Sequence, residues 1–203
     1  MPSCVGVVLA GGLSARMGVE KAALPIGDET LLARIVRRLR LALPEVVVIG
    51  PRRLQSLVPD VAVFPDETPG LGPLGGLSTA LASTARPRAF VTACDMPFVA
   101  PALVAAMARY AERYPTVDVL ALSAAARGLE PLHAIYSRAC APIVRARIDS
   151  GGDHSLGALL QSLNVKALPP SIVARYDPAG RSTFNANSAD EWRHVLAICA
   201  EEE

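Results

Sequence analysis

A glycine-rich segment near the N-terminus carries most of the residues whose types suit phosphate chemistry. An apolar run ends at the pair Gly11-Gly12, and Ser14, Arg16 and Lys21 follow soon after. Glycines let backbone N–H groups approach a phosphate closely, and the two cations add fixed positive charge. The combination predicts a phosphate-binding loop, although it matches neither the Walker A pattern nor the alternating glycines of the dinucleotide fingerprint.

Two aspartates and a pair of asparagines are further candidates. Asp95 follows an apolar run and suits Mg²⁺, which takes one or two carboxylates and leaves its other positions to phosphates and water. An exposed turn aspartate is the alternative reading of that position. Asp66 also follows an apolar run, and a turn before Pro69 would explain it as well. Asn185 and Asn187 would face the same side of an extended segment, and they also fit ordinary turn and cap positions.

Two other patterns could indicate different chemistry. Residues Gly70–Gly75 spell G-x-G-x-x-G, as in a nicotinamide dehydrogenase. That motif should follow a strand directly and open a helix, whereas Pro65–Pro69 separate it from the preceding apolar run. We also expect Pro73 to break up the loop. Ser14 lacks the final glycine of a nucleophile elbow, and we expect Cys94 to be a packed thiol.

The composition excludes several classes of partner. Twenty lysines and arginines against nineteen aspartates and glutamates give a net charge of +1, too little to predict binding to a nucleic-acid backbone. The chain is 51% hydrophobic, which argues against disorder, yet its longest nearly apolar run, Phe98–Ala108, is too short to span a membrane. No export signal is recognisable and the four cysteines are scattered, so we expect reduced thiols in a cytoplasmic protein. The three histidines show no zinc spacing.

Short apolar runs alternate with stretches of helical periodicity along the chain. The expected strands are Val5–Ala10, Val46–Ile49, Val61–Phe64, Ala89–Ala93, Val117–Leu122, Leu132–Tyr136 and Val165–Leu168. Helices are expected after the cap Thr30, over Gly76–Thr84, Ala100–Tyr114, Ala139–Ser150 and Ser155–Leu163, and after Ser188, which has capping-box spacing to Glu191. The alternation predicts a single α/β domain over residues 1–203, a doubly wound, mostly parallel sheet with helices on both faces. Ligands bind such sheets at the carboxyl ends of the strands.

The pattern L-A-G-G-x-S-x-R-M-G-x-x-K over Leu9–Lys21 resembles the signature of the molybdenum cofactor guanylyltransferases. Further segments agree with that family in order along the chain: Phe64–Asp66, Pro69–Leu77, Ala93–Phe98, Pro131–Tyr136 and Phe184–Ser188. The resemblance covers nearly the whole chain. It implies a Rossmann-like nucleotidyltransferase fold with a nucleotide-binding half, residues 1–125, and an acceptor-substrate half, residues 126–203.

The resemblance also implies the reaction and the residues that carry it. GMP passes from GTP to the terminal phosphate of molybdopterin in the presence of Mg²⁺, and pyrophosphate is released. The implied nucleotide-binding residues are Leu9, Ala10, Gly11, Gly12, Ser14, Lys21, Asp66 and Asp95. The implied catalytic residues are Arg16, Lys21 and Asp95, with Asp95 as metal ligand and Asn185 and Asn187 near the acceptor. Transient contact with proteins that deliver or receive the cofactor is implied, whereas nucleic acid and membrane are not.

Two positions bear on the choice of nucleotide. The family with Leu-Ala-Gly-Gly uses GTP and a relative with Leu-Ala-Ala-Gly uses CTP, because a side chain at Gly11 would crowd a purine. Ile49 departs from the polar residue with which guanylyltransferases help to read the base. The alternatives are a cofactor cytidylyltransferase, a nucleotidyltransferase for a sugar phosphate or cobinamide phosphate, and a non-catalytic nucleotide- or cofactor-binding protein.

Overall fold

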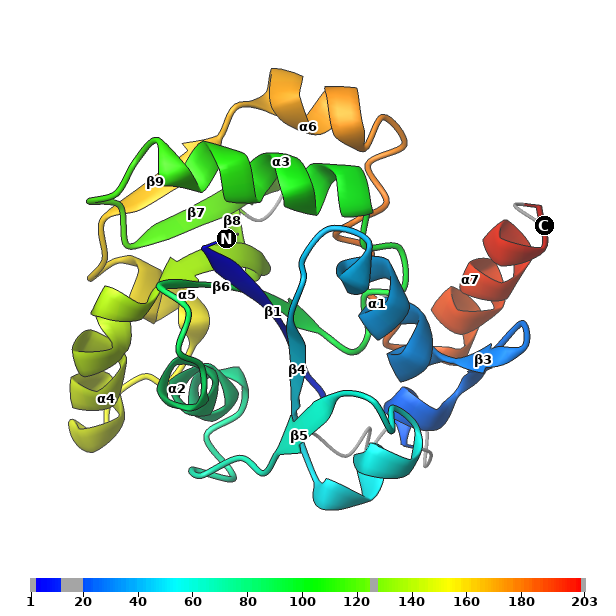
Figure 1. Ribbon diagram of the computed structural model, residues 1–203, viewed down its shortest axis with the longest axis horizontal. Coiled ribbons are helices and arrows are strands. Elements are labelled where there is room, and N and C mark those ends of the chain that lie inside the picture. The colour runs from blue at the N-terminus through cyan, green and yellow to red at the C-terminus, as the bar shows by residue number, and fades with distance from the viewer. Residues whose placement is uncertain (1–2, 12–19, 125–127, 202–203) are drawn as a thin grey trace.

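A central sheet runs through the computed structural model, which describes residues 3–11, 20–124 and 128–201 (Figure 1). Within these residues the sheet has seven strands in the order β5-β4-β1-β6-β8-β7-β9. Their bounds are β1 Cys4–Leu9, β4 Val46–Ile49, β5 Ala62–Phe64, β6 Arg88–Ala93, β7 Val119–Ala124, β8 Gly128–Ser137 and β9 Val165–Leu168. A separate small hairpin joins β2, Pro25–Ile26, to β3, Glu29–Thr30. The first strand therefore lies inside the sheet, between β4 and β6.

The strands of the sheet point the same way except for β8. β1 pairs in parallel with β4 and β6, β4 pairs in parallel with β5, and β7 with β9. β8 runs antiparallel to both of its neighbours, β6 and β7. The carboxyl ends of β1, β4, β5 and β6 consequently meet at one edge, where ligands bind in sheets of this kind. The mostly parallel sheet predicted from the sequence is confirmed.

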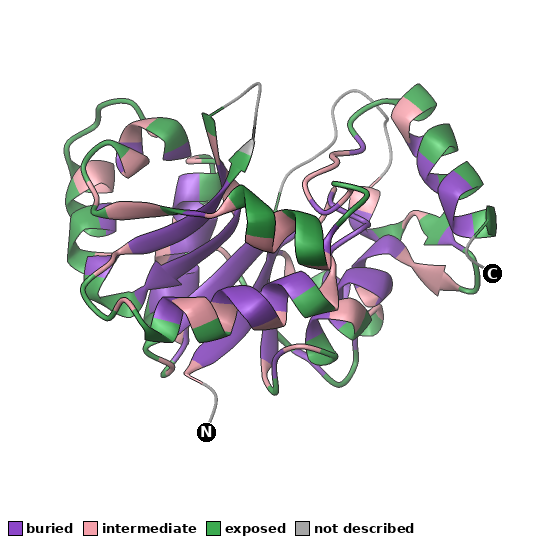
Figure 2. Ribbon diagram, turned by 90° about the horizontal axis from the view of Figure 1, so that it is seen from above, coloured by how far each residue is buried: buried purple, intermediate pink, exposed green. Residues whose placement is uncertain are grey.

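Helices cover both faces of the sheet. Their bounds are α1 Leu31–Arg40, α2 Pro73–Ser83, α3 Pro101–Glu112, α4 Ala141–Asp149, α5 Leu156–Leu160, α6 Pro170–Tyr176 and α7 Ala189–Glu201, with short 3₁₀ helices at Lys21–Ala23, Arg52–Ser56 and Arg138–Cys140. α1, α3 and α7 share one buried apolar cluster with Val8 of β1, and α2, α4 and α5 share another with Val7. The strands between them are buried from both sides (Figure 2). Burial on both faces explains why β1 reads as one continuous apolar run.

The start of α2 corrects one expectation. We expected this helix to begin at Gly76 and Pro73 to break up the preceding loop, but α2 begins at Pro73. Proline fits the first turn of a helix, where its missing N–H would have no intrahelical partner. Gly72 precedes it with a φ of +59°, a conformation that favours glycine. The G-x-G-x-x-G segment does open a helix, and its separation from β5 is what distinguishes it from a dinucleotide fingerprint.

His133 is buried in the middle of β8. Its side chain is inaccessible to solvent, lies opposite Thr92 of β6, and packs edge-on against Phe90 with ring centroids 4.9 Å apart. Among the described residues neither ring nitrogen has a hydrogen-bond partner. Burial lowers the pKa of His133 to about 4, although the charge of Asp177 opposes that shift. The imidazole is therefore neutral at neutral pH and serves as part of the core.

The cysteines lie in mostly apolar surroundings, and none of them forms a disulfide among the described residues. Cys4, Cys140 and Cys199 are buried, and Cys94 is partly buried. Burial raises the pKa of Cys4 and of Cys140 to about 12, so both thiols are protonated at neutral pH. Three of the four thiols are thus packed in the core. Across the described parts of the chain, no helix has the length and apolar character needed to cross a membrane.

Candidate active site

A cavity of about 220 Å³ lies at the carboxyl edge of the sheet, walled by the ends of β1, β4 and β6 and by the start of α2. The predicted site residues that line it are Leu9, Gly11, Lys21, Asp66 and Asp95, with Ile49 beside them. The lining residues that the sequence analysis did not assign to the site are Gly72, Pro73, Gly76, Ala93, Leu132 and Cys94. Gly76 is packed against Leu9, because a Cβ there would lie 3.2 Å from that side chain. A larger residue at this point, where α2 passes the end of β1, would require the Leu9 side chain to shift by a few tenths of an ångström.

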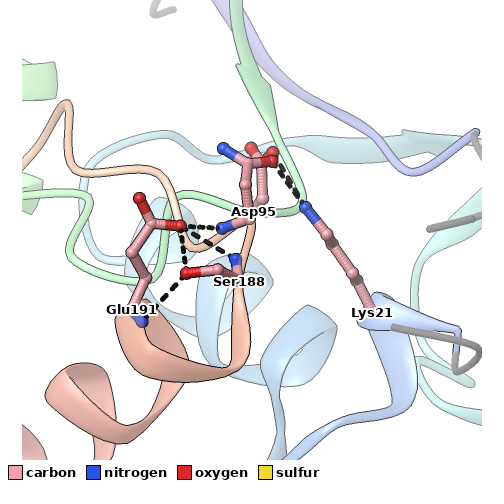
Figure 3. A network of polar contacts seen from close by, with 5 residues as sticks. Lys21, Asp95, Ser188 and Glu191 are labelled. Atoms are coloured by element: carbon pink, nitrogen blue, oxygen red, sulfur yellow. Dashed lines mark hydrogen bonds and ion pairs between the residues drawn. The ribbon is translucent and has the colours of Figure 1, made fainter. Parts of the chain in front are cut away.

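Three segments far apart in the sequence meet at one ammonium group (Figure 3). Lys21, at the start of a 3₁₀ helix, points its Nζ at the carboxylate of Asp95, 3.4 Å from Oδ2. The same Nζ donates a 2.7 Å hydrogen bond to Oδ1 of Asn187, just before α7. The side chains of Lys21 and Asp95 are 14% and 22% exposed, so water screens their attraction only in part. The predicted phosphate-binding cation, Lys21, therefore contacts both the predicted metal ligand, Asp95, and a predicted acceptor-binding residue, Asn187.

The capping box of α7 fixes the segment that carries Asn187. Glu191 Oε2 accepts hydrogen bonds from the backbone N–H groups of Asn187 and Ser188 at 2.7 and 2.8 Å, and from Ser188 Oγ at 3.1 Å (Figure 3). In return, Ser188 Oγ accepts a 3.2 Å hydrogen bond from Glu191 N. These contacts, first of all the one from Asn187 N, lower the pKa of Glu191 and keep it ionised. Ala186 N donates to the backbone oxygen of Asp95 at 2.9 Å, which ties the segment to the end of β6.

Asp66 accepts hydrogen bonds from its own loop and from α2. Its Oδ1 accepts from Thr68 N at 2.9 Å and from Thr79 Oγ1 of α2 at 3.1 Å, and Thr79 Oγ1 accepts from Glu67 N at 3.0 Å. Gly75 packs so closely against this turn that a Cβ there would lie 2.6 Å from Thr68 O. The turn-forming role that the sequence left open is therefore present. Because Asp66 also lines the cavity, a nucleotide-binding role stays a prediction beside it.

Gly11 lies between two cavities. Besides the first, it lines a second cavity of about 500 Å³ together with Gly50, Pro51, Pro65, Asp66, Pro69, Gly70 and Gly72. A Cβ added at Gly11 would meet no described atom within 4 Å, and the φ of Gly11 lies outside the left-handed region. Alanine would therefore fit this backbone without strain. Its methyl group would stand in open space beside both cavities.

Aromatic rings line a groove next to the asparagine segment. Phe184, which precedes Asn185, packs against Phe98 with ring centroids 6.0 Å apart and against His194 of α7 at 5.7 Å. These three residues line a groove of about 380 Å³ with Arg181 among its polar members. The volume of this groove and the exposed ring of His194 suit a flat organic ligand.

Cys94 lines the first cavity as a protonated thiol. Burial, and to a smaller extent the charge of Asp95, raises the pKa of Cys94 to about 12, and the charge of Lys21 opposes that shift. A thiol in this state is a poor nucleophile at neutral pH. The structure therefore agrees with the packed thiol expected at this position. The oxygen- and nitrogen-containing side chains of the cavity are the better candidates for its chemistry.

Comparison with known proteins identifies the family. The model of the MobA-like NTP transferase domain matches residues 6–167. The chain belongs to this family. A relative from Pelotomaculum thermopropionicum is 40% identical over 140 residues, which cover 69% of this chain and 66% of the relative. Another, from Chloroflexus aggregans, is 34% identical over 199 residues, covering 95% and 93%, and both are described as probable molybdenum cofactor guanylyltransferases.

Solved structures share the fold of this MobA-like NTP transferase. Molybdopterin-guanine dinucleotide biosynthesis protein A from Archaeoglobus fulgidus has a TM-score of 0.83 at 25% identity, covering 97% of this chain and 99% of the other. A Mycobacterium tuberculosis protein, described as a complex with manganese, has a TM-score of 0.64 at 22% identity, covering 96% and 98%. The sheet described above is thus a nucleotidyltransferase sheet, and the chain is a nucleotidyltransferase.

Some of the predicted residues of this MobA-like NTP transferase lie outside the described part of the chain. They are Gly12, Ser14 and Arg16. Of the others, Leu9 and Ala10 are buried at the end of β1. Asn185 keeps its Oδ1 buried, and no described residue donates to it. Asn187 is therefore the member of the asparagine pair that the structure joins to Lys21.

Proposed function

We propose that this MobA-like NTP transferase moves GMP from GTP to the terminal phosphate of molybdopterin and releases pyrophosphate. The observation that carries the proposal is the meeting of Lys21, Asp95 and Asn187 at the carboxyl edge of the sheet. Relatives up to 40% identical bear the corresponding name. A cytoplasmic location is part of the proposal, because the triphosphate is an intracellular substrate and the described cysteines form no disulfide.

The residues present fit a Mg²⁺ ion that arrives with phosphate oxygens. The oxygen atoms that accept from Lys21 Nζ are a carboxylate oxygen of Asp95 and an amide oxygen of Asn187, both hard ligands of the kind that magnesium takes. Among the described residues no three histidine, cysteine, aspartate or glutamate side chains gather as a complete metal cage. One carboxylate is sufficient for Mg²⁺ in a site where substrate phosphates supply further ligands. When bound there, the ion would neutralise charge on the triphosphate.

The chain's own contribution is to align two anions that repel each other. In this scheme Lys21, which lines the cavity, and backbone N–H groups of the glycine-rich loop would bind the phosphates together. The acceptor oxygen attacks the α-phosphorus and the bond to the bridging oxygen of pyrophosphate breaks, so no covalent enzyme intermediate is needed. Positioning and charge stabilisation account for the rate. In this scheme residues 1–125 serve the nucleotide and residues 126–203 serve the acceptor.

Two substrate subsites follow from the cavities. The base would enter the cavity of about 500 Å³ beside Gly11, whose walls are mostly glycine and proline. Ile49 lines the neighbouring cavity and offers the base no polar side-chain atom, so recognition of guanine falls to backbone groups and Asp66. The ring system of the acceptor would enter the aromatic groove at Phe184, which directly precedes Asn185.

The proposal is tested by measuring pyrophosphate release from the purified protein. The protein is given Mg²⁺, molybdopterin and each of the four ribonucleoside triphosphates in turn. We expect pyrophosphate release and a dinucleotide product with GTP, and only when molybdopterin is present. Release with CTP instead would make the protein a cytidylyltransferase. Tight nucleotide binding without pyrophosphate release would contradict the enzymatic proposal and favour a binding protein.

Gly11→Ala should lower the GTP-to-CTP ratio of kcat/KM by about tenfold or more. One methyl group in a pocket is worth about 1–3 kcal/mol, so we expect a shifted preference. The φ of Gly11 is ordinary and no described atom lies within 4 Å of a Cβ there, so we expect no backbone strain from the substitution. Gly157→Ala is a matched control, because a Cβ at that glycine of α5 also meets nothing within 4 Å. A parallel fall for both nucleotides would restrict Gly11 to shaping the loop.

Phe184→Leu should raise KM for molybdopterin about fivefold and leave KM for GTP unchanged. Leucine keeps the site apolar but removes the face on which a flat ring can stack, an interaction worth about 0.5–1.5 kcal/mol. Steady-state kinetics with each substrate varied in turn checks this. If KM for both substrates rises together, Phe184 supports the asparagine segment and does not contact the acceptor.

A further inference from the structure

Lys21 and a divalent cation would compete for the same carboxylate. Nζ lies 3.4 Å from Asp95 Oδ2, on the residue that the proposed function assigns to the metal. An ammonium at that distance already satisfies part of the charge of Asp95 and repels a second cation. Both side chains are mostly buried, which limits the screening of that repulsion by water.

The surroundings favour this position of Lys21. Lys21 Nζ makes two contacts, and the shorter one is the 2.7 Å hydrogen bond that it donates to Asn187 Oδ1. The ammonium is therefore held by Asp95 and by Asn187. Glu191 in turn fixes the backbone of Asn187 through its 2.7 Å hydrogen bond, which makes Glu191 a positioning residue for this contact. The lysine side chain is nonetheless flexible and its ammonium is a point charge. A triphosphate that enters the cavity would therefore draw the ammonium from Asp95 to its phosphates.

We propose that Lys21 is a latch that occupies Asp95 until the triphosphate arrives. In the nucleotide-free protein the ammonium neutralises Asp95 and weakens its affinity for a divalent cation. Lys21 then turns to the phosphates, and the freed carboxylate accepts the cation that accompanies them. The metal site is thereby completed only when the nucleotide is present. This inference rests on the proposed function, which supplies the triphosphate and the metal.

The latch is tested by titrating the nucleotide-free protein with Mn²⁺. Electron paramagnetic resonance measures the concentration of the free ion. Lys21→Met should bind Mn²⁺ at least tenfold more tightly than the wild type, although the change removes a residue of the active site. Lys21→Gln, which keeps a polar tip for Asn187, should show a gain of the same direction. Lys166→Met is the matched control, because Lys166 is the only other lysine in the sequence and lies over the ring of Tyr114.

The site of the added affinity is checked by combining Lys21→Met with Asp95→Asn, which should abolish the gain. An affinity equal to that of the wild type in both Lys21 variants would overturn the latch, and so would a gain that survives loss of Asp95. A parallel titration with GTP present separates this outcome from failure of the proposed function. If the wild type binds Mn²⁺ with GTP but the variants show no gain without it, the latch alone is wrong. If Mn²⁺ fails to bind even with GTP, the proposed metal role and the latch fail together.

Discussion

Asp95→Asn should reduce the rate of GMP transfer about a thousandfold or more while the fold stays intact. Asparagine keeps the size of the side chain but removes the charge that would hold the metal beside the triphosphate. A thousandfold in rate corresponds to about 4 kcal/mol of transition-state stabilisation. The fold should survive because Ala186 N bonds the backbone oxygen of Asp95, which the substitution leaves in place.

Initial rates of pyrophosphate release in metal-purified buffer, with Mg²⁺ added back, measure this effect. Asp28→Asn provides a matched control, because Asp28 is an exposed aspartate in the turn between β2 and β3. The control should turn over like the wild type, and both variants should melt close to the wild-type temperature. Turnover of Asp95→Asn within about tenfold of the wild type would remove Asp95 from the metal site.

Acidification should destabilise the fold by about 3 kcal/mol through His133 alone. The pKa of this histidine is about 4 in the folded protein because burial disfavours the charged ring, whereas an unfolded histidine titrates near 6.5. Between these two values the unfolded chain binds a proton that the folded chain does not. The free energy of unfolding is therefore unaffected by His133 above pH of about 6.5, falls as the pH drops toward 4, and levels off below.

Urea unfolding at several pH values between 8 and 4, for the wild type and for His133→Leu, measures the contribution of His133. Leucine is a suitable replacement because neither ring nitrogen has a hydrogen-bond partner among the described residues, so no such contact is lost. The wild type should lose more stability than the variant across this window. Identical pH dependence in the two proteins would show that His133 gains access to water or to a proton acceptor.

The strands were predictable because burial on both faces leaves a strong signal in the sequence. Val46–Ile49 and Val165–Leu168 have the predicted bounds, and β1 is shifted by one residue. The hairpin of β2 and β3 was missed because strands of two residues are too short to show a period. α6 was missed because none of its residues is buried, so it has no apolar stripe.

Single residues of the candidate site could be predicted from the sequence, whereas the contacts between them could not. Local patterns identified Lys21 and Asp95, because glycines, cations and a carboxylate at strand ends have recognisable chemistry. Their contact with Asn187 depends on a segment 166 residues away from Lys21, and periodicity carries no information on such pairings. Leu132 and Gly76 lie in segments that agree with the family but were not assigned to the site, because an apolar residue or a glycine in a cavity wall looks like any other in sequence.

The position of β8 determines how far the two proposed halves, residues 1–125 and 126–203, can be treated as modules. β8, from residues 126–203, lies between β6 and β7 of the first half, and both neighbours of β7 come from the second half. A fragment ending at residue 125 would leave β6 with an open edge and β7 with no partner, a state prone to aggregate. The halves also cannot open like a clamshell, since strands of each are hydrogen-bonded inside the other. Chimeras with new nucleotide or acceptor preferences must therefore be made by exchanging loops at the carboxyl edge of an unbroken sheet.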